Sequence, residues 1–77
     1  MIDTIRFETD DKYYLIDCYQ DMLDDLVVVC TYGSKHSRST QRKIIKVDSL
    51  AAAENTIASI TKVRYRHGYD LVQGQLL

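Results

Sequence analysis

The 77-residue sequence contains no proline, three glycines and two cysteines. Without proline-rich or low-complexity stretches the chain shows no linker, so we expect a single domain over residues 1–77. The glycines, at positions 33, 68 and 74, are too scattered to form a glycine-rich phosphate-binding loop. A domain of this size buries only roughly 60% of its unfolded surface, which leaves little room for a deep active site.

Long hydrophobic runs are also missing. No stretch approaches the roughly 18–20 apolar residues that a membrane span requires. The N-terminal sequence has no basic segment followed by an apolar one, so we expect no signal peptide and a cytoplasmic chain without membrane association. In that compartment Cys18 and Cys30 are expected to be reduced thiols rather than parts of a disulfide framework.

Residues suited to nucleophilic catalysis or metal binding are few. Cys18, Cys30, His36 and His67 form neither a C-x-x-C nor an H-x-x-x-H motif. Neither histidine has an acidic residue at a spacing that suggests a catalytic pair. The sequence therefore predicts no catalytic residue, no metal site and no cofactor.

Charge is distributed unevenly, although the net charge is −1. Residues 1–30 hold eight acidic and two basic side chains, a net −6, whereas residues 31–77 hold eight basic and three acidic side chains, a net +5. Such a split can produce one positive face on a nearly neutral molecule. The alternative is that opposite charges interleave in space and serve solubility.

Hydrophobic patterning predicts four strands followed by one amphipathic helix. Alternating apolar residues, or runs of branched and aromatic ones, predict strands over residues 4–8, 13–19, 26–32 and 42–47. A helix is expected from Leu50 to about His67, followed by an extended segment over residues 69–72. One such helix must cover an apolar surface, so the sequence predicts an α+β fold in which about four twisted antiparallel strands carry the helix on one face.

The ends of the helix carry capping signals. Asp48-Ser49 supplies an N-cap, with Glu54 near the first turn, and Gly68 fits the left-handed position after the last turn. Leu50, Ala53, Ile57 and Ile60 lie at helical spacing and predict the stripe that faces the sheet.

The central hairpin is expected to pair Tyr19 with Leu26 across a six-residue loop. Cys18 and Cys30 then lie about three residues apart along the ladder, roughly 10 Å, which is beyond disulfide reach. Both cysteines are therefore expected to be small buried apolar residues. Tyr14, Ile16 and Cys18 are expected to face the helix.

The long polar loop after Tyr32 is the most informative functional feature. It mixes hydroxyls with cations, the groups that contact phosphate oxygens, and an aromatic ring at its entrance can stack on a base or sugar. The sequence predicts a nucleic-acid interface, for the phosphate backbone of DNA or RNA, made by Tyr32, Gly33, Ser34, Lys35, Arg38, Arg42, Lys43, Arg64 and Arg66.

Two other interpretations stay open. The loop can be a solvated segment that keeps the domain soluble, and Tyr32, like the other tyrosines, can belong to the core or its rim. The acidic and basic halves of the chain can also meet a protein partner, or each other in a homodimer.

Several short motifs follow one another along the chain. Lys12-Tyr13-Tyr14, Tyr19-Gln20-Asp21 and Tyr32-Gly33-Ser34 are followed by Gln41, Asp48-Ser49 and Arg66-His67-Gly68-Tyr69. In this order and spacing, over about residues 5–70, the chain resembles the WGR domain, which occurs in some poly(ADP-ribose) polymerases and in many bacterial proteins. The resemblance implies a twisted antiparallel sheet with one helix, and a non-catalytic domain that binds nucleic acid, best understood at DNA ends.

Some residues depart from the WGR pattern. Tyr32 keeps a ring where the family tryptophan packs on a terminal sugar, but Ser34 replaces the arginine that helps connect DNA to neighbouring domains. The usual glycines of the next loop are replaced by His36, Ser37, Ser39 and Thr40. These departures weaken the case for recognition of DNA breaks and for signalling between domains. Generic phosphate contact stays expected, because the cations of the loop and the following strand are present.

Overall fold

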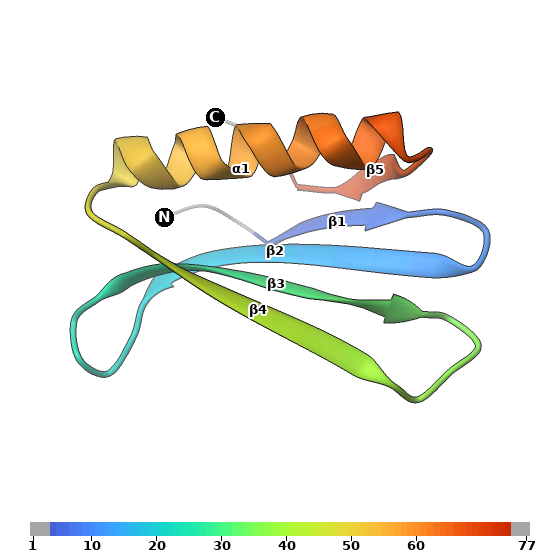
Figure 1. Ribbon diagram of the computed structural model, residues 1–77, viewed down its shortest axis with the longest axis horizontal. Coiled ribbons are helices and arrows are strands. Elements are labelled where there is room, and N and C mark those ends of the chain that lie inside the picture. Colours follow the sequence, from blue (N-terminus) through green and yellow to red (C-terminus); the bar gives the residue numbers. More distant parts are fainter. Residues whose placement is uncertain (1–3, 75–77) are drawn as a thin grey trace.

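The computed structural model describes residues 4–74 as an open, five-stranded antiparallel sheet with one helix on one face (Figure 1). The elements are β1 (Ile5–Glu8), β2 (Lys12–Gln20), β3 (Leu26–Ser34), β4 (Thr40–Val47), α1 (Leu50–Arg66) and β5 (Asp70–Gln73). The strands lie in the order β4-β3-β2-β1-β5, so β4 and β5 form the two edges. The predicted α+β class and the helix on one face are confirmed.

The sheet contains one strand more than the sequence predicts. The extended segment after the helix pairs with β1 as β5, so that Leu71 lies opposite Phe7. In addition, β3 continues to Ser34 and β4 begins at Thr40, which reduces the predicted polar loop over residues 33–41 to five residues, 35–39.

The β2–β3 hairpin differs from the prediction by one residue of register. Tyr19 pairs with Val27 instead of Leu26, because the connecting turn spans residues 21–25. Within this turn Asp24 adopts a left-handed backbone with φ of 63°, a conformation that aspartate tolerates better than most residues. A shift of one residue moves every side chain of a strand to the other face of the sheet. Val28, Cys30 and Tyr32 therefore face the helix, on the same side as Tyr14, Ile16 and Cys18.

Helix α1 begins and ends where its capping residues predict. The Ser49 hydroxyl accepts a hydrogen bond from the Ala52 N–H at 3.1 Å, and Gly68 has a φ of 85°. The first turn holds no acidic residue, so Glu54 lies beyond it and does not contribute to the cap. In residues 4–74, α1 is the single helix, and it is not long and apolar enough to cross a membrane.

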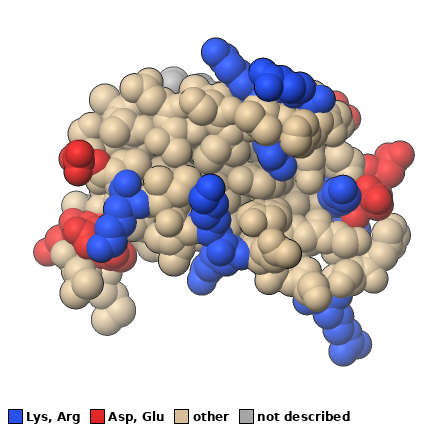
Figure 2. Space-filling view, in the orientation of Figure 1, with Lys and Arg blue, Asp and Glu red and all other residues tan. Residues whose placement is uncertain are grey.

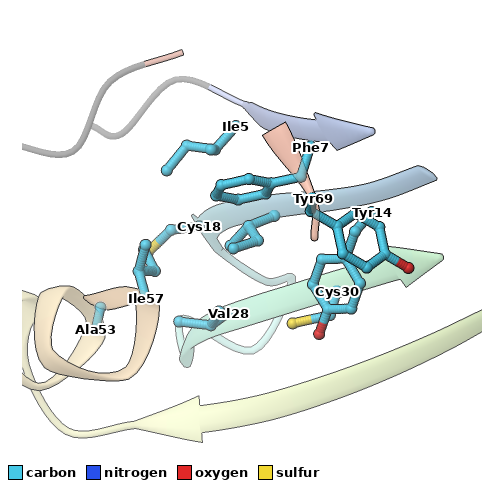
Figure 3. Close-up of a cluster of buried hydrophobic side chains, with 10 residues drawn as sticks. Ile5, Phe7, Tyr14, Cys18, Val28, Cys30, Ala53, Ile57 and Tyr69 are labelled. Atoms are coloured by element: carbon cyan, nitrogen blue, oxygen red, sulfur yellow. The ribbon is translucent and has the colours of Figure 1, made fainter. Parts of the chain in front are cut away.

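The core lies between α1 and the sheet (Figure 3). Ala53 and Ile57 are fully buried as predicted, and Ile60 packs against the same cluster, but Leu50 is 49% exposed. The buried members of the cluster are Ile5, Phe7, Tyr14, Ile16, Cys18, Val28, Cys30, Ala53, Ile57 and Tyr69. Both cysteines are free and buried, which confirms their expected state.

The face of the sheet opposite α1 has a buried row of its own. Val27 and Val29 are 2% and 0% exposed although they point away from the helix-side cluster. Their cross-strand neighbours shield them, since Val29 lies between Asp17 and Ile44 in the register. Ile44 itself is 59% exposed, so no second layer among residues 4–74 covers it on this face.

Candidate nucleic-acid interface

Tyr32 lies inside β3 rather than at the entrance of a loop, and its side chain is half-buried. Its ring stacks on Tyr14, with ring centroids 5.2 Å apart and an interplanar angle of 10°. Tyr14 therefore covers one face of the Tyr32 ring, and at most one face remains for a base or a sugar. The one-residue register shift explains this arrangement, because it places the two rings directly opposite each other on the helix side of the sheet.

Gly33 and Ser34 support the β3–β4 turn. A Cβ atom on Gly33 would lie 2.7 Å from the carbonyl oxygen of Ser39, so only glycine allows the chain to return this closely. The Ser34 hydroxyl donates to the Asp11 carbonyl at 3.3 Å and accepts from the His36 N–H at 3.1 Å. These two predicted contact residues thus have structural roles in the β3–β4 region.

Lys35 is held in an internal ion pair. Its Nζ lies 2.6 Å from Oε1 of Glu8, and Arg6 Nε lies 2.6 Å from the other oxygen of the same carboxylate. Hydrogen bonds from Lys35 and then from Arg6 lower the pKa of Glu8 below its usual value of 4.5. The Lys35 N–H also donates to the Asp11 carbonyl at 2.7 Å, which ties the β3–β4 turn to the β1–β2 turn. The predicted phosphate contact by Lys35 would therefore have to compete with Glu8.

Arg38, Arg42 and Lys43 are exposed, and none of the three forms a salt bridge with any residue among 4–74. Arg38 lies in the β3–β4 turn, and the other two lie on the edge strand β4. Arg42 pairs with Thr31 and Lys43 with Cys30, so the two cations point to opposite faces of the sheet. Long basic side chains on both faces of an edge strand can nevertheless reach one ligand that approaches the edge itself.

Arg64, in the last turn of α1, is half-buried between the helix and the sheet. Its guanidinium lies 4.3 Å from the ring centroid of Tyr14 and 5.1 Å from that of Tyr69. Cation–π contacts of this kind are worth about 0.5–2 kcal/mol and hold the side chain against the aromatic cluster. Burial also raises the pKa of the Tyr14 hydroxyl well above its usual value, and the neighbouring Cys30 thiol adds to that shift. Arg64 is therefore part of the packing between helix and sheet.

Arg66 points away from the side of α1 that packs on the sheet. It lies nine residues after the buried Ile57, or about two and a half helical turns, which places it on the opposite side of α1. The nine predicted residues consequently do not form one patch. The structure places Tyr32 opposite Gln41 of β4, with Arg42 and Lys43 on opposite faces of that strand and Arg38 in the turn before it. It leaves Lys35 and Arg64 in internal contacts and separates Arg66.

The surface view shows the same division of charge. Basic side chains are strung across the face along which β4 runs and also lie over α1, whereas acidic side chains gather toward the two ends of the molecule (Figure 2). Lys46, at the end of β4, is paired with Asp25 across a gap of 3.3 Å. Exposed cations without a salt bridge in residues 4–74 therefore lie on the central part of β4 and the turn before it, and also at Lys12, Lys62 and Arg66.

Two exposed apolar features were not predicted from the sequence. Ile44 stands between the cations of β4, and Met22 and Leu23 at the β2–β3 turn are 100% and 80% exposed. The hydrophobic character of Met22 and Leu23 amid acidic residues was visible in the sequence, but only the turn geometry shows that neither side chain is covered. No group of three or more metal-binding side chains comes together in residues 4–74.

Comparison with known proteins adds no assignment to this geometry. No family model matches the chain, and the searches of curated proteins and of solved structures also returned no match.

Proposed function

We propose that this protein is a non-catalytic DNA-binding module of the WGR type, which contacts the phosphate backbone along its β4 edge. The observation that carries the proposal is the set of three exposed cations, Arg38, Arg42 and Lys43, none of which has a carboxylate partner in residues 4–74. Phosphate contacts supply most of the sequence-independent affinity of a protein for DNA, and basic side chains are their main source.

The half-buried ring of Tyr32 supports this location. Tyr32 pairs with Gln41 of β4, so its ring lies on the helix side of the sheet next to the strand that carries the cations. A ring already stacked on Tyr14 is fixed in orientation, and a pre-ordered ring loses little entropy when a base or sugar packs on it. The interface we propose therefore consists of Tyr32, Arg38, Arg42 and Lys43, a subset of the residues that the sequence predicts.

The resemblance to the WGR domain supports the same function. The resemblance implies a twisted antiparallel sheet with one helix, and the chain has an antiparallel sheet with one helix, although with five strands where about four were predicted. Ser34, at the position of the family arginine, makes two hydrogen bonds within the β3–β4 region. We therefore propose generic phosphate contact for this chain, without the coupling to a neighbouring domain.

Fluorescence anisotropy with short DNA duplexes tests the proposal. Affinity should fall with salt, and three neutralised phosphates predict a log–log slope of about −2.7. The Arg42→Gln/Lys43→Gln variant should reduce that slope by about 1.8, whereas Lys62→Gln, which changes an exposed cation on α1, should leave it nearly unchanged. Duplexes with and without 5′-phosphate ends show whether ends matter. Absence of binding at low salt, or the same slope in the β4 variant, would overturn the proposal.

A further inference from the structure

The β2–β3 turn presents two apolar side chains that nothing in the described chain covers. Met22 is 100% exposed and Leu23 is 80% exposed, the two largest values among the exposed hydrophobic residues of residues 4–74. The turn is nevertheless fixed in shape. One Asp21 carboxylate oxygen accepts hydrogen bonds from the Leu23 and Asp25 N–H groups at 2.9 and 3.0 Å. A backbone bond from Asp21 to Asp25 at 2.9 Å closes the turn.

Acidic residues surround this apolar pair. Asp21, Asp24 and Asp25 share the turn with Met22 and Leu23, and no cation lies within residues 20–26. We call these five residues, 21–25, the acidic tip. Its charge disfavours both DNA and anionic lipid surfaces, because the acidic side chains would lie against other negative charges. The surface that fits the tip is therefore one with exposed apolar area between cations.

The β4 edge of the same protein has that chemistry. Ile44 is 59% exposed, and it lies between Arg42 and Lys46 along the face of the sheet opposite α1. Lys43 projects from the other face of the same strand, and it and Arg42 have no acidic partner among residues 4–74. The cations also protect this edge from pairing with an identical edge, since two such strands would repel each other. They do not repel an acidic surface.

One contact within the molecule already joins the two surfaces. Asp25 of the acidic tip pairs with Lys46 of β4 at 3.3 Å. The tip of the same molecule lies at the end of β4 where Lys46 and Val47 stand, because Val47 is opposite Leu26 in the register. The acidic tip therefore reaches Lys46 of its own molecule, whereas Arg42 and Lys43, farther along the strand, have no acidic partner in residues 4–74.

From these observations we propose that the acidic tip of one copy docks on the β4 edge of a second copy, with Met22 and Leu23 against Ile44. The contact is head-to-tail, so each copy keeps one free tip and one free edge, and association can continue into longer chains. The interface is small, which predicts a weak complex that forms at high protein concentration or high local density. The inference rests on the proposed function in one respect only: docking would cover the DNA-binding cations, so DNA and a second copy should exclude each other.

Sedimentation of the whole chain at low salt, up to about 0.5 mM, tests self-association without any DNA, at a concentration suited to weak interfaces. We expect the average mass to rise with protein concentration and to return to that of a monomer when salt is raised, since the contact needs its opposite charges as well as its apolar pair. Two variants separate the two surfaces: Met22→Ser/Leu23→Ser removes the apolar part of the tip, and Arg42→Gln/Lys43→Gln removes the cations of the edge. All four positions are exposed, and circular dichroism checks that both variants fold.

Each variant alone should remain a monomer, and their equimolar mixture should form dimers and nothing larger, because the first keeps an intact edge and the second an intact tip. A monomeric wild type at the highest concentration, a tip variant that still associates, or a mixture that stays monomeric would overturn the inference.

DNA binding is measured separately at nanomolar protein, where copies do not meet. Loss of DNA binding with self-association intact would sink the proposed function alone, and the reverse result would sink this inference alone. If the tip instead serves another protein with a basic rim, the wild type stays monomeric.

Discussion

Lys35 and Arg42 lie seven positions apart in the same basic segment, yet they stand in different electrostatic surroundings. Lys35 meets Glu8 at 2.6 Å, on a carboxylate that also binds Arg6. Arg42 is exposed on an edge strand and forms no salt bridge with any residue among 4–74. A count of basic residues treats the two as equal, whereas the fold leaves only one of them free for a ligand.

The difference follows from the topology of the sheet. The β3–β4 turn begins beside the β1–β2 turn, because the Lys35 N–H donates to the Asp11 carbonyl. At this position the Lys35 side chain meets the carboxylate of Glu8. β4 then runs back along the outer edge, where its one strand neighbour is β3. The part of β3 that faces Arg42 and Lys43 carries Thr31 and Cys30, neither of which is acidic. Arg42 and Lys43 therefore remain available because their neighbours in the sheet are not acidic, whereas Lys35 and Lys46 each lie beside an acidic side chain.

Removing the free cations should produce the largest effect. We expect the Arg38→Gln/Arg42→Gln/Lys43→Gln variant to bind duplex DNA about 100-fold or more weakly at about 0.1 M salt, because three counterion-releasing contacts are lost. Fluorescence anisotropy measures the change. Lys35→Gln is the matched control, and it should change affinity less than about threefold because Glu8 already neutralises that cation. Equal losses of affinity in both variants would show that Lys35 is as available to DNA as the three unpaired cations.

The ring of Tyr32 should come next. We expect Tyr32→Ala to weaken DNA binding by about 5- to 150-fold, since stacking on an aromatic side chain is worth about 1–3 kcal/mol. Tyr32→Phe keeps the ring and the stack on Tyr14, and should bind like wild type. Both variants need a matching measurement of the free energy of unfolding, because Tyr32 also packs against the core. A Tyr32→Ala variant that is folded and binds with unchanged affinity would remove the ring from the interface.

Gly33 lies in β3 just before the turn that carries Lys35 and Arg38. We expect Gly33→Ala to lower the free energy of unfolding by about 1–3 kcal/mol, because the added Cβ forces the backbone near Ser39 to move. Gly68→Ala provides a contrast, since nothing lies within 4 Å and only the φ of 85° opposes the change, at about 1 kcal/mol. Urea denaturation measures both, and a Gly33→Ala variant as stable as wild type would show that the turn is free to adjust.

The ion pair of Glu8 should give the smallest effect and a definite pH dependence. The pKa of Glu8 is lower in the folded protein than its usual 4.5, so its contribution to stability is present above the unfolded pKa and is lost as pH falls through the folded one. Glu8→Gln should flatten the stability curve in this acid range and slightly raise DNA affinity, because Lys35 and Arg6 are released. NMR titration of the Glu8 side chain checks the sign, and a pKa at or above 4.5 would contradict it.

The sequence predicted most of the fold because its signals were local. The Ser49 cap, the left-handed Gly68 and the Ala53–Ile57 stripe each depend on residues within one or two helical turns, and the structure confirms all three. The fifth strand was weaker in the sequence, since Asp70–Gln73 is short and exposed and is defined by its pairing with β1.

The site was predicted less well because its geometry depends on one residue of register. Counting from the sequence placed Tyr19 opposite Leu26, which puts Tyr14 and Tyr32 on opposite faces of the sheet. A five-residue turn instead pairs Tyr14 with Tyr32 and partly buries the ring. The length of that turn depends on the left-handed Asp24 and on the hydrogen bonds of Asp21, which composition does not specify. The Lys35–Glu8 pair likewise joins residues 27 positions apart.

An NMR titration of the ¹⁵N-labelled protein with a short DNA duplex at low protein concentration locates the DNA-binding surface. The proposed interface predicts that amide shifts change along β4 and the preceding turn, from Arg38 to Lys43, and at Tyr32, while Lys35 and the acidic tip stay nearly unchanged. Shifts centred on Lys35, on Arg66 or on the acidic tip would contradict it, and so would a spectrum that does not change at all.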